Sequence, residues 1–177
     1  MYHTISKNQN FLNKKHKNGT TVSLTNQLII ADNFAKNFIN LSTINTLDEI
    51  TSLGKYAFSA TAITSFTLPK NITTLPDYCL NNCIQLKTLT LNDVCQHIGN
   101  YAVGNCGSLK EIVWNDTVSS IDNNSFEYYT SLKRAILPKS MIHLGSEVKS
   151  LSKLNSYQQI FSFILCCLSL KLILSVL

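Results

Sequence analysis

The stretch LKTLTL at residues 86–91 recurs as LKEIVW at residues 109–114, 23 residues further along the chain. Both stretches carry apolar residues at relative positions 1, 4 and 6. Because side chains alternate along a β-strand, positions 4 and 6 point to one face of a short strand and position 5 points to the other. Each stretch is therefore predicted to be a strand with one buried side.

The same period of about 23 residues runs through the middle of the chain. Four series of apolar residues keep one register, and we expect all of them to face the core. A fixed period in this range predicts a solenoid, in which no repeat can bury its apolar face alone. The predicted repeat core consists of Leu53, Ile63, Phe66, Leu68, Leu75, Leu86, Leu89, Leu91, Ile98, Leu109, Ile112, Trp114, Ile121, Leu132, Leu137 and Leu144.

The other half of each repeat carries a large, a small and a large residue in succession. The triplets are YAF at 56–58, YCL at 78–80, YAV at 101–103 and NSF at 124–126. Such a triplet suits a tight helical turn packed closely on its neighbour. Each coil is thus predicted to contain one strand, a turn, a short helix and a return, with the strands stacked into a parallel ladder.

Several short motifs accompany the repeat: Ile-Gly-x-Tyr-Ala at 98–102, Asn-Cys at 82–83 and 105–106, and Ser-Leu-Lys at 108–110 and 131–133. With these motifs the chain resembles the BspA-like leucine-rich repeat family of surface-antigen type, over roughly residues 50–145. The resemblance implies an α/β repeat solenoid, a right-handed coil with short parallel strands on one face and short helices or turns on the other. It also implies a surface protein of a bacterium or protist that adheres to host, matrix or neighbouring cells.

The formal net charge is +5, and much of the surplus lies in a segment before the repeats that lacks apolar periodicity. We expect that segment to be a solvated tail. The predicted organisation is a disordered basic tail at 1–27, a repeat domain at 28–148 with a degenerate coil at 28–50 and clear coils at about 51–145, a linker at 149–159, and an apolar C-terminal helix at 160–177.

The C-terminal segment IFSFILCCLSLKLILSVL, residues 160–177, has a single charge, Lys171. Its length lies near the lower limit for a membrane span, so a membrane anchor is the leading interpretation. A cleaved lipid-anchor signal and a helix that caps the stack are the alternatives. Since no secretory leader is visible, an anchored chain would keep its repeats in the cytosol, whereas the resemblance implies the cell surface. Glycosylation sequons, which are usable only outside the cytosol, begin at Asn18, Asn40, Asn71, Asn115 and Asn123.

The six cysteines suggest no reactive site. Cys83 and Cys106 lie one repeat apart, with Ala60 and Tyr129 taken as their counterparts, which favours a small buried slot over a disulfide between coils. Cys79–Cys83 and Cys95-x-His97 do not make a zinc quartet. We predict no catalytic residue, metal site or cofactor, and we predict that the chain is not an enzyme.

The outward side of the strands is the candidate ligand face, because solenoids usually bind along that extended surface. Beside it, the lysines at 87, 110 and 133 form a basic column suited to a protein or an acidic glycan. Membrane contact is expected through residues 160–177, and no nucleic acid is expected. A tail-anchored intracellular scaffold and a fragment of a longer repeat protein are the alternatives to an adhesin. The candidate residues are Ser65, Thr67, Lys87, Thr88, Thr90, Lys110, Glu111, Val113, Lys133, Arg134 and Ile136.

Overall fold

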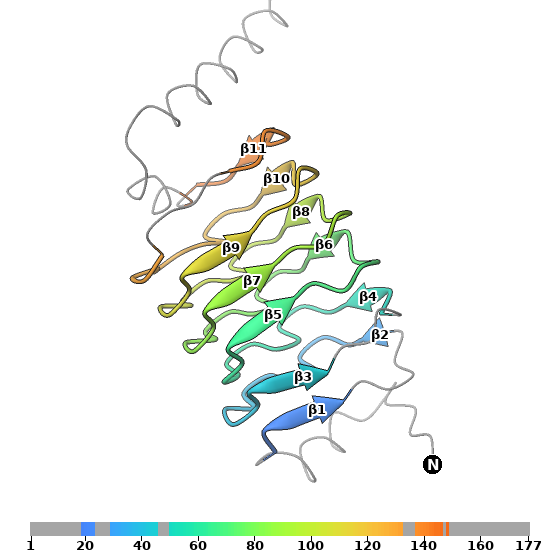
Figure 1. Ribbon diagram of the computed structural model, residues 1–177, viewed down its shortest axis with the longest axis vertical. Coiled ribbons are helices and arrows are strands. Elements are labelled where there is room, and N and C mark those ends of the chain that lie inside the picture. Colours follow the sequence, from blue (N-terminus) through green and yellow to red (C-terminus); the bar gives the residue numbers. More distant parts are fainter. Residues whose placement is uncertain (1–18, 24–28, 46–49, 133–136, 147, 149–177) are drawn as a thin grey trace, which may run out of the picture.

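The computed structural model describes residues 19–23, 29–45, 50–132, 137–146 and 148. Within these residues the chain winds into a parallel β-solenoid of about five coils (Figure 1). Its strands are β1 (Thr21–Ser23), β2 (Ile29–Ile30), β3 (Thr43–Asn45), β4 (Ser52–Leu53), β5 (Ser65–Thr67), β6 (Thr74–Leu75), β7 (Thr88–Thr90), β8 (His97–Ile98), β9 (Glu111–Val113), β10 (Ser120–Ile121) and β11 (His143–Leu144).

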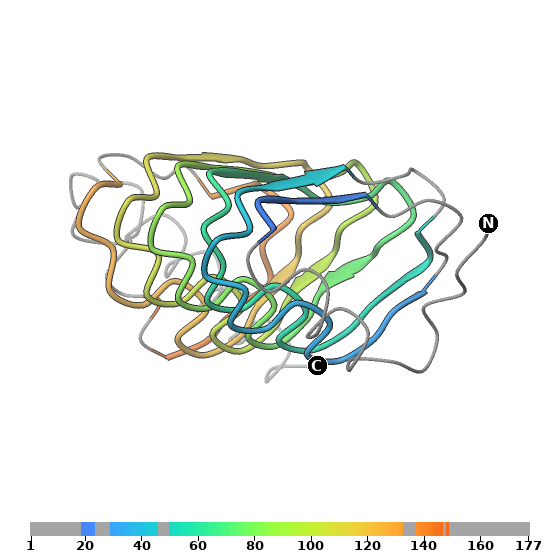
Figure 2. The same ribbon diagram turned by 90° about the horizontal axis from the view of Figure 1, so that it is seen from below.

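The strands stand in two rows, which Figure 2 shows on different sides of the coil. The long-strand row contains β1, β3, β5, β7 and β9, and the short-strand row contains the other strands. All pairs are parallel, so that Phe66 lies beside Leu89, and Leu89 beside Ile112. The predicted parallel ladder is confirmed. The short-strand row, which holds the series from Leu53 to Leu144, is a second strand in each coil that the sequence interpretation lacked.

The ladder is interrupted at one level of the stack. β3 does not pair with β5, and β4 does not pair with β6. On the turn side the backbone bonds continue across this level, from Tyr56 N to Asp77 O at 3.2 Å, Phe58 N to Cys79 O at 2.9 Å and Ala60 N to Asn81 O at 2.8 Å. The core and the turns therefore hold the first coils to the later ones.

The triplets form turns, and the described residues contain no α-helix. The first residue of each triplet has a positive φ: 57° at Tyr56, 57° at Tyr78, 51° at Tyr101 and 58° at Asn124. A right-handed helix requires a negative φ at every residue. The expectation of short helices is therefore wrong, and its alternative, turns, is what the structure shows.

The interior is one continuous apolar column along the stack. Most of the predicted repeat core is buried, while Ile112, Trp114 and Leu137 are half-buried and pack against that column. Leu144 is the exception, with 37% of its surface exposed. It lies in β11, the last strand of its row, where no further described coil covers it.

The solenoid begins earlier than expected. β1 lies inside the segment 1–27, which we expected to be disordered throughout, yet β1 pairs with β3 and Val22 is only 7% exposed. The sequence does carry a signal for β1, because Val22 precedes Ile44 by the repeat spacing, and in the structure Val22 lies directly beside Ile44. The neighbouring strand supplies the backbone partners that order this short segment.

The predicted linker at 149–159 and the apolar segment at 160–177 lie outside the described residues. Among the residues that the structure does describe, no helix is long and apolar enough to cross a membrane.

Candidate functional site

The outward side chains of β5, β7 and β9 form a regular polar surface, which we call the strand face. Ser65, Thr88 and Glu111 lie side by side in one column, and Thr67, Thr90 and Val113 form the second column. The two threonines of β7 are half-buried and the other four residues are exposed. Neighbouring strands in a sheet lie about 4.8 Å apart, so the face presents side chains at a fixed spacing.

The fold positions these side chains by burying the residue between them. Phe66 is 4% exposed and Leu89 is 0% exposed, so each anchors the middle of its strand in the core. Because a strand alternates, the residues on both sides of each anchor must point outward. The structure thus brings together six of the residues predicted for the ligand face.

The same side of the molecule continues onto β1 and β3, which the sequence interpretation left out (Figure 1). Thr21, Thr43 and Asn45 are exposed there. The signal was present in the sequence, since Thr43-Ile44-Asn45 has the pattern of Ser65-Phe66-Thr67, 22 residues earlier.

A basic column begins at the start of these strands. The Lys110 N–H donates to the Lys87 carbonyl at 2.9 Å, and the Lys87 N–H donates to the Thr64 carbonyl at 2.8 Å. Both lysine side chains are exposed, and Glu111 is the neighbouring residue of the face. The third predicted lysine, Lys133, lies outside the described residues, as do Arg134 and Ile136.

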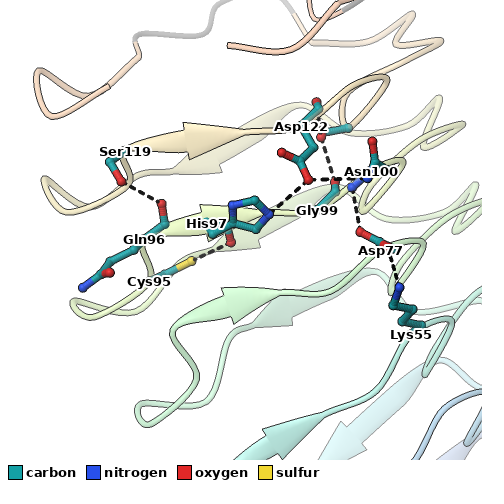
Figure 3. Close-up of polar contacts among 10 residues, drawn as sticks. Lys55, Asp77, Cys95, Gln96, His97, Gly99, Asn100, Ser119 and Asp122 are labelled. Atoms are coloured by element: carbon teal, nitrogen blue, oxygen red, sulfur yellow. Dashed lines mark hydrogen bonds and ion pairs between the residues drawn. The ribbon is translucent and has the colours of Figure 1, made fainter. Parts of the chain in front are cut away.

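A polar network lies near the short-strand row and joins successive coils (Figure 3). The Lys55 Nζ lies 2.8 Å from Asp77 Oδ2, and the Asn100 N–H donates to Asp77 Oδ1 at 3.0 Å. Asp122 Oδ2 lies 3.1 Å from His97 Nε2 and accepts from Asn100 Nδ2 at 3.4 Å. Burial raises the pKa of the Asp77 carboxyl, but its hydrogen bonds to Lys55 and Asn100 lower that pKa overall. Each contact links one coil to the next.

The described cysteines are free thiols, and all are buried. Cys83 Sγ donates to the Phe58 carbonyl at 3.2 Å, and Cys106 Sγ donates to the Leu80 carbonyl at 3.3 Å. The preceding coil has Thr61 in this position, whose hydroxyl bonds to Phe58 O at 2.9 Å, so Ala60 was the wrong counterpart by one residue. The slot is buried, and each of these side chains places a hydrogen-bond donor in it.

The pair of Cys95 and His97 has no geometry for nucleophilic catalysis. Cys95 Sγ faces the His97 backbone carbonyl at 3.7 Å, while the imidazole faces Asp122. Burial raises the pKa of the Cys95 thiol to about 11, and a protonated thiol is a poor nucleophile. The described residues also contain no group of three or more histidine, cysteine or acidic side chains that could hold a metal ion.

Residues 6–133 and 51–164 match the BspA type leucine rich repeat region, in 6 copies. The chain belongs to the BspA-type leucine-rich repeat family. Leucine-rich repeat proteins generally serve as modules for protein interaction. No curated protein matches the chain.

The chain is similar to two solved structures. A leucine-rich repeat protein from Eubacterium ventriosum has a TM-score of 0.56 and 18% identity, over 70% of this BspA-type chain and 40% of that one. The pneumococcal vaccine antigen PcpA has a TM-score of 0.47 and 16% identity, over 71% of this chain and 46% of its own. The chain thus spans less than half the length of either protein, and at these identities the likeness concerns the fold alone.

Proposed function

We propose that this BspA-type protein is a non-enzymatic cell-surface protein that recognises an extended protein or an acidic glycan through its strand face. The observation that carries this proposal is the regular array of outward side chains on β5, β7 and β9, with exposed lysines along its edge. An extended ligand can contact several coils at once, because each coil repeats the same positions.

The basic column gives the face its charge preference. Lys87 and Lys110 lie in adjacent coils, so their ammonium groups add at one edge of the face. A cluster of like charges attracts a ligand of the opposite charge and raises its rate of association. The Glu111 carboxylate, in the column beside the two lysines, repels acidic groups of a ligand. The acidic groups of the ligand are therefore expected at the lysine edge and not across the whole strand face.

Among the described residues, His97 and two of the buried cysteines are engaged in the structure of the coil. The His97 side chain faces Asp122, and the thiols of Cys83 and Cys106 bond to backbone carbonyls. This supports a binding role over a catalytic one. Attachment to a membrane through residues 160–177 is part of the proposal, and a piece of a longer repeat protein would carry the same strand face.

The test compares two charge reversals of equal size. The double variant Lys87→Glu/Lys110→Glu changes the edge of the strand face, whereas Lys70→Glu/Lys139→Glu changes two exposed lysines in turns, one after β5 and one before β11. Binding of the full chain to immobilised heparin and to laminin is measured at two salt concentrations. We expect the first variant to lose about tenfold in affinity, roughly 1.4 kcal/mol, and the control to stay within about twofold.

Equal losses in the two variants would show that net charge, and not the strand face, governs binding. Failure of the unaltered chain to bind either probe would remove the proposed ligand classes.

A further inference from the structure

Four of the glycosylation sequons begin at described residues, and the fold places them in different environments. An Asn-x-Ser/Thr sequon marks a possible N-glycan, which is bulky and must remain at the surface of the folded protein. Asn40, Asn71 and Asn123 are exposed, whereas Asn115 is buried, with 9% of its surface exposed. The structure therefore separates sequons that the sequence alone treats as equal.

Asn115 uses both ends of its side-chain amide, the nitrogen toward the preceding coil and the oxygen within its own coil. Its Nδ2 donates to the Asn92 carbonyl and, at 3.2 Å, to the Cys95 carbonyl. Its Oδ1 accepts from the Thr117 N–H at 3.2 Å and from the Val118 N–H at 3.0 Å. A glycan on Nδ2 would replace one of the two donated hydrogens and place a sugar where the preceding coil lies. The folded coil cannot carry that modification.

Asn40 and Asn71 lie at the surface instead. The residue that follows each of them is an anchor in the core: Leu41 is 0% exposed and Ile72 is 4% exposed. Both asparagines lie in turns, and their own side chains are exposed. A sugar attached there would extend into solvent without disturbing the core. Asn123 is also exposed, and its Oδ1 accepts from the Ser146 N–H and hydroxyl at 2.6 and 3.0 Å; the assignment does not include it.

The two turns lie at opposite edges of the long-strand row. Asn40 precedes β3, in the turn that leads into it, and Asn71 follows β5, in the turn that leaves it. Because the strands of the row run parallel, all of them begin at one edge and end at the other. Neither turn belongs to the strand face itself.

We propose that Asn40 and Asn71 are N-glycosylation sites of the folded solenoid, that Asn115 is not, and that the two glycans border the long-strand row while leaving the strand face open. The co-reactant is an oligosaccharide carried on a lipid diphosphate. The asparagine Nδ2 forms a bond to C1 of the first sugar and loses a proton, the bond from C1 to the phosphate oxygen breaks, and the lipid diphosphate leaves. This inference rests on the proposed surface location, because only a chain that enters a glycosylating compartment meets that donor.

The test expresses the full chain behind a cleavable secretion leader in a eukaryotic cell and isolates the folded, protease-resistant fraction. Removal of the glycans with peptide-N-glycosidase in heavy-oxygen water converts each modified asparagine to a labelled aspartate, which mass spectrometry locates. We expect label at Asn40 and Asn71 and none at Asn115. Absence of label at either exposed site, or label at Asn115 in the folded fraction, overturns the assignment.

Two binding measurements separate this inference from the proposed function. The leader-bearing chain is tested on heparin and laminin: label at Asn40 and Asn71 without binding to either probe would leave the site assignment standing while the proposed ligand classes fail. The variant Asn40→Gln/Asn71→Gln tests the open face, since it should bind heparin or laminin within about twofold of the glycosylated chain. A gain of more than about tenfold would mean that the glycans cover the face and would overturn that part of the inference.

Discussion

Asn115→Ala removes the side chain that makes four hydrogen bonds within and between two successive coils. The largest cost comes from the Val118 N–H, because Val118 is 0% exposed and water cannot replace the lost acceptor. A buried donor without a partner costs roughly 1–3 kcal/mol. The Thr117 N–H lies in an exposed turn and can bond to water, so its loss adds little.

The hydrogen bonds that the Asn115 Nδ2 donates contribute less. The Cys95 carbonyl keeps the Thr117 hydroxyl as a donor at 2.8 Å, and the Asn92 carbonyl keeps the longer bond from the Cys95 N–H at 3.4 Å, so the Asn92 carbonyl loses its shorter bond. An ordinary hydrogen bond contributes about 1 kcal/mol net. Together these terms predict that Asn115→Ala lowers the free energy of unfolding by about 3 kcal/mol.

Urea denaturation of the full chain, followed by circular dichroism, measures this change. For an m-value of about 2 kcal/mol/M, the loss corresponds to a fall of about 1.5 M in the midpoint. The matched control is Asn40→Ala, which removes an exposed asparagine from a turn and should change stability by less than about 0.5 kcal/mol. A loss below about 1 kcal/mol for Asn115→Ala, at an unchanged m-value, would refute the reasoning that this buried amide stabilises the stack through its four hydrogen bonds.

Three other predictions follow from contacts between coils. Tyr78→Ala removes stacking on the rings of the tyrosines before and after it, at centroid distances of 4.5 and 5.0 Å, and should cost about 1–3 kcal/mol in the same denaturation assay. Gly99→Ala places a Cβ 2.7 Å from the Asp77 nitrogen and should cost roughly 1–3 kcal/mol, whereas Gly107→Ala meets nothing nearer than a hydroxyl at 3.5 Å and serves as the control. Burial raises the pKa of Cys95 to about 11, so peptide mapping after iodoacetamide treatment at neutral pH should find this thiol unlabelled in the folded chain and labelled in urea. The pKa of the Cys95 thiol in the folded chain lies above that of the unfolded thiol, which is about 8.5. The free energy of unfolding should therefore fall as the pH rises from about 8.5 through about 11. A flat stability profile over that pH range would contradict the burial of Cys95.

The long-strand row was predictable because its signal is local and repeated. Phe66, Leu89 and Ile112 each stand between two outward residues, and alternation alone assigns the faces. The strand face followed from the same rule. The short-strand row gives a weaker signal, since a strand of two residues contains a single buried position, as Leu75 does in β6. The repeat spacing identifies the buried residue, but it does not reveal that the backbone at this residue pairs with the strand of the next coil.

The turns were misread because large residues occupy left-handed positions. A bulky side chain at positive φ is disfavoured in isolation, so Tyr56, Tyr78 and Tyr101 suggested a helix. The equivalent positions at the two ends of the stack indicated a turn instead of a helix, because they are occupied by Asn33 and Asn124. Asparagine tolerates this conformation well, and its recurrence in a column marks a left-handed turn. In the structure each tyrosine gains a stacked neighbour, which offsets part of the strain.

The interior and the strand face of this solenoid are constrained by different neighbours. An interior side chain must fit the coil before and after it, as when Cys83, Cys106 and Tyr129 each reach a carbonyl of the preceding coil. On the strand face one column runs from Ser65 through Thr88 to Glu111, a change of size and charge that the backbone ladder accommodates without a change of register. Surface substitutions of this kind usually alter stability by less than about 0.5 kcal/mol. Binding specificity can therefore change along the strand face while the fold stays the same. Variants of the strand face should alter affinity at unchanged stability. Variants such as Asn115→Ala should lower stability at unchanged affinity, as long as the coil remains folded.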